Sequence, residues 1–274
     1  MITHHTRLTI LLLFLYSLLS IWNYAAAMPS RVIVASTAEN VPTSPVEGKP
    51  TCVYWDICGL AQTIRMALAL AGVDFVDVRI DPGSPNDSDY KQVWFRKKPS
   101  LMAGVLPFAN LPYYMDGSVS LSQSNTILKY IGRQHGLLGP PGKEHIVDLA
   151  LDQLVDLDNS FFWLAYPEGA DALKTWCEEE VPAALVQWEH FLGSEKFLTG
   201  DSVTVADLKL YESLRKIRVV EKEICNQNDT SQVGGSSKMA DFMKRIEAIP
   251  AIKEYMESAD YMARPLNNPH ALFK

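Results

Sequence analysis

From Thr51 onward, the hydrophobic positions of the chain follow first a strand-like and then a helical spacing. Residues 51–55 form a short apolar run, which is typical of a buried strand. The next apolar residues recur on one face of an α-helix, and they are Leu60, Ile64, Ala67, Leu68 and Ala71. Gly72 favours a helix end, and residues 76–80 then alternate apolar and charged side chains as a second strand does. This order predicts a βαβ unit with two parallel strands.

A hairpin and a further helix follow in the pattern. After the turn-rich loop Asp81–Tyr90, the stretch LPYYMDGSVSL predicts two antiparallel strands joined at Asp116-Gly117, where glycine supplies a positive φ. A helix is expected from about Gln123 to His135. The order βαβ and then ββα predicts a thioredoxin-like domain over residues 51–136.

From about residue 143, helical spacing replaces the strand signals. An apolar stripe over residues 146–164 predicts a long helix. Thr204-Val-Ala-Asp207 has the spacing of a capping box, with an acid one carbon shorter than Glu, and predicts a helix through Leu214. Two more helices are expected over residues 241–249 and 250–258. Residues 143–274 are therefore predicted to be all-helical, so the fold class is α/β followed by all-α.

The first fifty residues have a different composition. Residues 8–30, 23 in all, carry no charged side chain and are almost continuously apolar as far as Trp22. Because small residues at Ala25 and Ala27 suit a signal peptidase, residues 1–27 are interpreted as a secretory signal peptide. The span is also long enough to be an uncleaved membrane anchor, whereas translation from Met28 would give a cytoplasmic form. Residues 28–50 mix Pro, Ser, Thr and Gly without a period and are expected to be a linker or a second targeting segment.

Composition and charge exclude several classes of protein. The chain is 47% hydrophobic and 21% charged, as a globular protein is. Its net charge of -7 argues against a nucleic-acid binder, whose affinity rests on clustered Lys and Arg. Its four cysteines are too few for a disulfide scaffold, and no Cys or His spacing predicts a metal site.

Several segments, taken in order, resemble one family. VYWDICGLAQTIR, FANLPYYMDG, LSQSNTILKYI, FLTGDSVTVAD and KRIEAIPAIKEYMES are similar to segments of the mu class of cytosolic glutathione transferases. The loop Asp81–Tyr90 lies where that class has an insertion, and the resemblance covers about residues 51–266. It implies a homodimeric detoxifying enzyme that conjugates glutathione to small hydrophobic electrophiles, without a metal. In such an enzyme residues 51–136 bind glutathione and residues 143–274 supply the electrophile site.

The resemblance assigns the catalytic role to Tyr54. An ordinary thiol has a pKa near 8.5, so only about 3% of it is ionised at pH 7. Lowering that pKa by about two units requires roughly 2.7 kcal/mol of preferential thiolate binding. A phenol that keeps its proton at neutral pH can donate a hydrogen bond to the sulfur and supply much of this energy.

The resemblance also assigns the groups that hold glutathione. The glycyl end is expected at Trp55, Lys91, Trp94 and Lys98, with Lys97 as a competitor for the role of Lys98. The cysteinyl part is expected at Asn110 and at Leu111-Pro112, a cis X-Pro step in the family. The γ-glutamyl carboxylate is expected at Gln123 and Ser124, at a helix N-terminus that favours anions. Asp156 is expected to reach the γ-glutamyl amine bound to the partner subunit.

The same resemblance assigns the electrophile and dimer contacts. Leu60 and Phe162 are expected to form an apolar wall, and Tyr166 to donate a hydrogen bond to the developing charge. Phe108 is expected to insert into the partner subunit, and Lys129 to lie near the two-fold axis. The C-terminal tail, residues 263–274, is expected to close the pocket.

Two alternatives and two departures from the family stay open. The chain could be a glutathione-dependent isomerase of the prostaglandin-synthase type, or a non-catalytic ligand-binding or structural relative. Cys58 replaces a basic residue near a helix N-terminus, where a thiol is either oxidisable or simply buried. Asn86 and Asn228 lie in glycosylation sequons, which matter only if the domain enters a secretory lumen.

Overall fold

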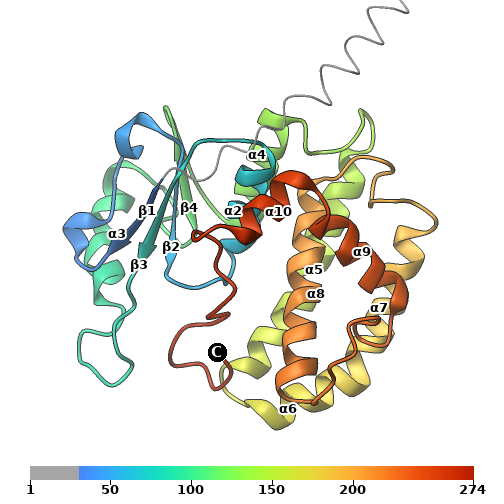
Figure 1. Ribbon diagram of the computed structural model, residues 1–274. Coiled ribbons are helices and arrows are strands. Elements are labelled where there is room, and N and C mark those ends of the chain that lie inside the picture. The colour runs from blue at the N-terminus through green and yellow to red at the C-terminus, as the bar shows by residue number, and fades with distance from the viewer. Residues whose placement is uncertain (1–30) are drawn as a thin grey trace, which may run out of the picture.

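The computed structural model describes residues 31–274 as a sheet domain and a helical domain packed side by side (Figure 1). The predicted leader, residues 1–27, lies outside the described residues, as do residues 28–30. No helix in residues 31–274 has the length and apolarity to cross a membrane. No group of three or more His, Cys, Asp or Glu side chains in that part of the chain is arranged to hold a metal ion.

The sheet has five strands in the order β1-β3-β2-β4-β5. Strands β2 (Thr51–Trp55) and β3 (Val76–Ile80) are parallel, with Tyr54 opposite Arg79, which confirms the predicted βαβ unit. Strand β4 (Tyr113–Asp116) runs antiparallel to β2 and forms a hairpin with β5 (Val119–Ser122). Gly117 has φ +55° in the turn of that hairpin, as its sequence predicted.

The expectation of a linker over residues 28–50 is wrong for its central part. Strand β1 (Arg31–Ala35) pairs in parallel with the outer edge of β3, with Arg31 opposite Val76 and Ala35 opposite Ile80. Ala35 and Val41 are fully buried, and the Tyr113 hydroxyl donates to the Pro42 carbonyl at 2.7 Å. This segment therefore covers an edge of β3 that would otherwise present unpaired backbone groups.

Three helices cover the sheet. Helix α2 (Gln62–Leu70) is buried along its whole length, because it lies between the sheet and the helical domain. Its Arg65 donates to both carboxylate oxygens of Asp77 on β3, at 3.1 and 3.0 Å. Helix α3 (Gln92–Gly104) covers the opposite face, and helix α4 (Ser124–His135) follows the hairpin as predicted.

The second domain is all-helical, as predicted. Helix α5 (Glu144–Ala165) leads into α6 (Ala170–Thr175), a π-helical turn (Trp176–Glu180) and α7 (Val181–Leu192). Helix α8 (Val205–Glu223) lies in the middle of the domain and begins at the predicted capping box, in which Thr204 and Asp207 bond each other's backbone N–H groups. Helices α9 (Ser237–Glu247) and α10 (Pro250–Glu257) precede the C-terminal tail.

The two domains meet along α2 and at the C-terminal tail. Helix α2 packs against α8 and α10, and the tail then runs back between the domains (Figure 1). The backbone N–H groups of Cys58 and Gly59 donate to the carbonyls of Pro265 and Leu266, at 2.8 and 3.1 Å. The loop after β2 is therefore fixed by residues some two hundred positions later in the sequence.

Candidate active site

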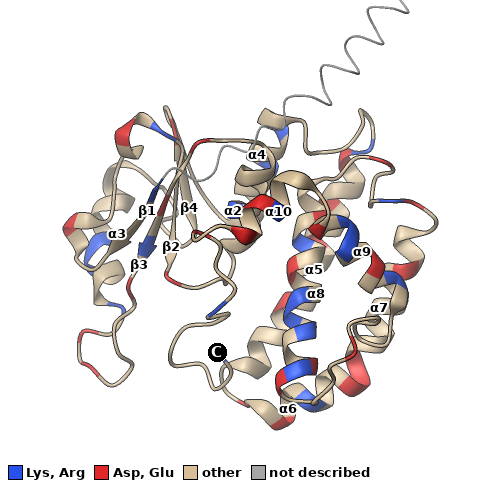
Figure 2. Ribbon diagram, viewed as in Figure 1, with Lys and Arg blue, Asp and Glu red and all other residues tan. Residues whose placement is uncertain are grey.

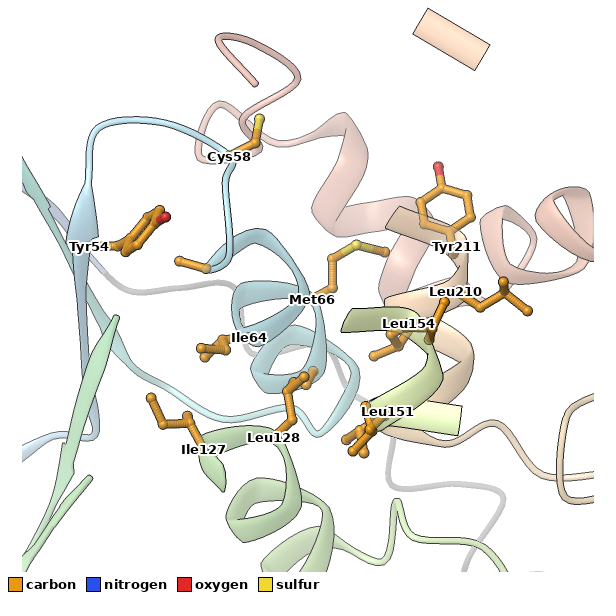
Figure 3. Packing of buried hydrophobic residues seen from close by; sticks show 14 of the residues in the cluster. Tyr54, Cys58, Ile64, Met66, Ile127, Leu128, Leu151, Leu154, Leu210 and Tyr211 are labelled. Carbon is orange, nitrogen blue, oxygen red and sulfur yellow. The ribbon is translucent and has the colours of Figure 1, made fainter. Parts of the chain in front are cut away.

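Tyr54 lies near the end of β2, where its phenol faces the loop that leads into α2 (Figure 3). The side chain is 7% exposed. Burial raises the pKa of Tyr54 to about 12, against a backbone hydrogen bond from Leu60 that lowers it. The phenol therefore keeps its proton at neutral pH and is available as a hydrogen-bond donor.

Cys58 is four residues from Tyr54 but is enclosed rather than reactive. Its side chain is 1% exposed, and its thiol donates to the Met262 carbonyl with an Sγ–O distance of 3.2 Å. Burial raises the pKa of the Cys58 thiol, which is opposite to the shift that an oxidisable thiolate needs. The structure therefore favours the interpretation of Cys58 as a buried packing residue.

The residues expected at the glycyl end are spread over β2 and α3. Trp55 and Trp94 are both buried, and the Trp94 ring stacks on Tyr113 with centroids 6.2 Å apart. Lys91 precedes α3 with φ +62°, an unusual conformation for a non-glycine residue that often marks a functional site. Lys97 and Lys98 are both half-buried on α3, so burial does not decide between them.

The residues expected at the cysteinyl and γ-glutamyl parts follow one another along the chain. The Leu111-Pro112 bond is cis, as the resemblance implied, and Asn110 before it is exposed. Gln123 has φ +72° and directly precedes Ser124, the first residue of α4. The free N–H groups of that helix end give Gln123 and Ser124 a setting that suits a carboxylate.

A cavity of about 250 Å³ joins these groups to the predicted electrophile wall. Leu60, Gln123, Ser124 and Phe162 all line it, so the structure brings together four residues predicted from distant parts of the sequence. Tyr166, at the end of α5, is half-buried, and its charge interaction with Tyr54 raises the pKa of Tyr54 further.

The C-terminal tail contributes two residues that the sequence analysis did not assign. The Asn268 backbone N–H donates to the Tyr166 hydroxyl at 3.1 Å. The His270 ring lies against Tyr166, with centroids 4.8 Å apart, and its Nδ1 is 2.6 Å from the Tyr90 hydroxyl and 3.4 Å from Lys91 Nζ. His270 thus connects the helical domain to the end of loop Asp81–Tyr90. Burial and the Lys91 charge lower the pKa of His270.

Comparisons with known proteins identify the family. A family model for the glutathione S-transferase N-terminal domain matches residues 50–133, and one for the C-terminal domain matches residues 155–259. A glutathione S-transferase of Tyrophagus putrescentiae is 39% identical over 214 residues, which is 78% of this chain and 92% of that protein. The chain belongs to the glutathione S-transferase family.

The resemblance to the mu class is confirmed as well. Glutathione S-transferase Mu 7 of Rattus norvegicus is 34% identical over 224 residues, which is 81% of this transferase and 97% of that protein. The crystal structure of the glutathione S-transferase Blo t 8 has 27% identity and a TM-score of 0.67, and it covers 81% of this chain and 99% of its own. Glutathione is therefore the substrate that this transferase shares with its family.

The residues assigned to the dimer lie on the surface of this transferase. Phe108 is 77% exposed, and Asp156 is exposed on α5. Lys129 forms an ion pair with Asp148 of its own chain, with Nζ 3.0 Å from Oδ1. Its expected place near a two-fold axis stays a prediction.

Proposed function

We propose that this glutathione S-transferase activates the glutathione thiol through Tyr54 for attack on small hydrophobic electrophiles, as in detoxification. The observation that carries the proposal is the buried Tyr54 phenol, hydrogen-bonded to the backbone of Leu60, which itself lines a cavity together with Gln123, Ser124 and Phe162. A buried hydroxyl donor stabilises a thiolate more strongly than water does, because the surrounding dielectric is low. The phenol keeps its own proton throughout.

Each part of glutathione has a proposed holder. Trp55, Lys91, Trp94 and Lys98 bind the glycyl end, and Asn110, Leu111 and Pro112 bind the cysteinyl part. Within residues 31–274, the Leu111 backbone makes no hydrogen bond to another backbone group, so it is free to pair with an extended peptide. Gln123 and Ser124 bind the γ-glutamyl carboxylate.

The electrophile side is proposed to be closed by the C-terminal tail. Leu60 and Phe162 supply apolar surface, and Tyr166 donates a hydrogen bond to negative charge that develops on the substrate or leaving group. Asn268 fixes the Tyr166 hydroxyl by donating its backbone N–H to it, which leaves the phenolic proton available.

The active unit is proposed to be a homodimer. A cavity of about 500 Å³ between α5 and α7 has a largely apolar lining that includes Leu149, Trp188 and Phe191, and the exposed Phe108 ring of a second copy matches it in chemistry. Asp156 lines a neighbouring cavity on the same face of α5, away from Gln123 and Ser124 of its own chain. This placement supports the proposal that Asp156 serves glutathione bound to the partner.

A conjugation assay tests the proposed function. The full-length protein is expected to bind immobilised glutathione and to conjugate a chlorodinitrobenzene well above the uncatalysed rate. If the protein binds glutathione but does not catalyse conjugation of this or other hydrophobic electrophiles, the result would favour a non-catalytic relative. Similarity to the structure of rat hPGDS, at 23% identity and a TM-score of 0.59, shows the fold alone and does not favour the isomerase alternative.

The leader is proposed to direct the enzyme to the secretory pathway or to hold it at a membrane. N-terminal sequencing of the native protein decides between cleavage after Ala27 and an intact anchor. A native chain that begins at Met28 by translation and stays cytoplasmic would contradict both.

A further inference from the structure

One side of the cavity that joins Gln123 and Ser124 to the electrophile wall carries a buried cation. The cavity of about 250 Å³ is mostly apolar, with Leu60, Val155 and Phe162 among its lining residues. Lys209, from α8 in the middle of the helical domain, also lines it. Figure 2 shows basic positions on successive turns of α8, a helix that the rest of the domain surrounds.

Lys209 has no carboxylate partner within the described part of the chain. Lys209 is only 6% exposed. Its Nζ donates hydrogen bonds to Asn125 Oδ1 at 2.7 Å and to the Leu151 carbonyl at 3.3 Å. Both acceptors are neutral, and no Asp or Glu oxygen of residues 31–274 forms an ion pair with Nζ within 4.0 Å. A buried ammonium group is costly unless an anion compensates it.

Asp158, the aspartate that lines this cavity, already forms an ion pair with another lysine, Lys216. One oxygen of Asp158, Oδ1, accepts hydrogen bonds from Lys216 Nζ at 2.7 Å and from the Ser213 hydroxyl at 2.9 Å. Lys216 and Asp158 are both buried, so this pair is poorly screened by solvent. Two lysines and one aspartate leave the buried cluster with a formal charge of +1.

We propose that this cavity is a carboxylate subsite, in which Lys209 binds the carboxylate of an amphipathic electrophile whose apolar body lies along Leu60, Val155 and Phe162. The substrate class is a hydrophobic electrophile with a carboxylate at the end remote from its reactive carbon, and an α,β-unsaturated aldehyde acid is the probe of that class used below. This inference rests on the proposed function and specifies its substrates. The γ-glutamyl carboxylate is the other possible source of the anion, but the N-terminus of α4 already offers it free N–H donors.

The charge state of Lys209 is consistent with such a ligand. Burial lowers the pKa of Lys209 to about 8; Asp158 and Asp152 on α5 oppose this shift and Lys216 on α8 adds to it, while Asn125 on α4 is neutral. Lys209 is thus mainly charged at pH 7, and a bound carboxylate would raise its pKa again. The preference for the acid is therefore expected below pH 8 and is lost as the pH rises through that value.

The conjugation itself consumes only the two substrates. The thiolate sulfur bonds to the β-carbon and the alkene electron pair moves toward the carbonyl to give an enolate. The α-carbon of the enolate then takes up one proton, which balances the proton that the thiol released on ionisation. The aldehyde acid and its methyl ester have the same unsaturated aldehyde group. They differ in the negative charge at the far end of the molecule.

The test compares kcat/KM for an α,β-unsaturated aldehyde acid and for its methyl ester in the full-length protein. We expect the wild type to prefer the acid about tenfold, an advantage that Lys209→Met removes while the ester reaction and the KM for glutathione stay unchanged. Lys253→Met, a substitution at an exposed lysine of α10, is the matched control and should keep the preference.

Several outcomes overturn the proposal. One is an equal kcat/KM for acid and ester in the wild type at pH 7. This measurement needs no variant, so it tests the proposal even if the Lys209→Met protein does not fold. Another is a KM for glutathione that is higher in Lys209→Met than in the wild type with both electrophiles. That result would assign Lys209 to the γ-glutamyl carboxylate. Turnover of the ester tests the proposed function separately, because that reaction makes no use of Lys209.

Discussion

The Tyr54 phenol packs directly against the backbone of Gly59, five residues later in the chain. A Cβ atom on Gly59 would lie 2.5 Å from Tyr54 Cε1 and 2.7 Å from the phenolic oxygen. Since real Cβ atoms do not approach other atoms so closely, glycine is required for the phenol to hold its present position. Gly59 also has φ +43°, which favours glycine independently of this contact.

Gly59→Ala is therefore expected to displace the phenol and to lower kcat/KM for conjugation at least tenfold. Gly117→Ala is the matched control, since Gly117 has φ +55° and open space where its Cβ would go. Both variants should lose about 1 kcal/mol of unfolding free energy from backbone strain, but only Gly59→Ala should lose activity. Equal activity in the two would show that the position of the Tyr54 phenol is unimportant.

The tail contact at His270 predicts a pH dependence. Burial and Lys91 lower the pKa of His270 below its unfolded value of about 6.5, so the unfolded chain binds the proton more readily. The contribution of neutral His270 is thus present above about pH 6.5 and is lost as the pH falls. Denaturant unfolding at a series of pH values should show a smaller loss on acidification for His270→Gln than for wild type. The control His145→Gln, at a histidine that is also exposed but lies at the start of α5, should follow the wild type.

The exposed Phe108 ring predicts the behaviour of the dimer. Phe108→Glu would bring a charge to an apolar cavity of the partner, so we expect the mass measured by light scattering to fall toward that of one chain. Phe95→Glu, at another exposed phenylalanine on α3, should leave the mass unchanged. Dimers of undiminished stability in Phe108→Glu would refute the proposed contact.

The buried ion pair between α2 and β3 predicts a large effect on stability. Asp77→Asn leaves the fully buried Arg65 without a counter-charge and also removes a partner of Arg79, so a loss of about 3 kcal/mol of unfolding free energy is expected. Asp241→Asn breaks an exposed pair with Lys244 and should cost less than about 1 kcal/mol. Similar unfolding midpoints for the two variants would show that the buried pair adds little.

The sequence predicted most of the fold because its local patterns agree with the final packing. The βαβ unit, the hairpin at Gly117 and the capped start of α8 each follow from spacing or turn chemistry over a few residues. Helix α3 was not predicted, because it is largely exposed and contains Pro99, which normally ends a helix. Strand β1 was missed because it buries only Ala35 fully and its pairing with β3 spans some forty residues.

The candidate site was predictable only as far as the family resemblance reached. Tyr54, Leu60, Gln123, Ser124 and Phe162 were assigned from matched segments, and the structure places the last four around one cavity. His270 could not be found in this way, because its contacts with Tyr90 and Tyr166 depend on the path of a tail without a regular pattern. Lys209 was missed for another reason: a lysine is ordinarily a surface residue, and only the tertiary structure shows it buried.

The central claim is that the Tyr54 phenol stabilises the glutathione thiolate. Its most direct test is a pH titration of bound glutathione, followed by the ultraviolet absorbance of the thiolate, in wild type and in Tyr54→Phe. We predict a thiol pKa about two units below 8.5 in the wild type and a return toward 8.5 in Tyr54→Phe, with glutathione still bound and most turnover at neutral pH lost. The same thiol pKa and the same turnover in both proteins would contradict the claim.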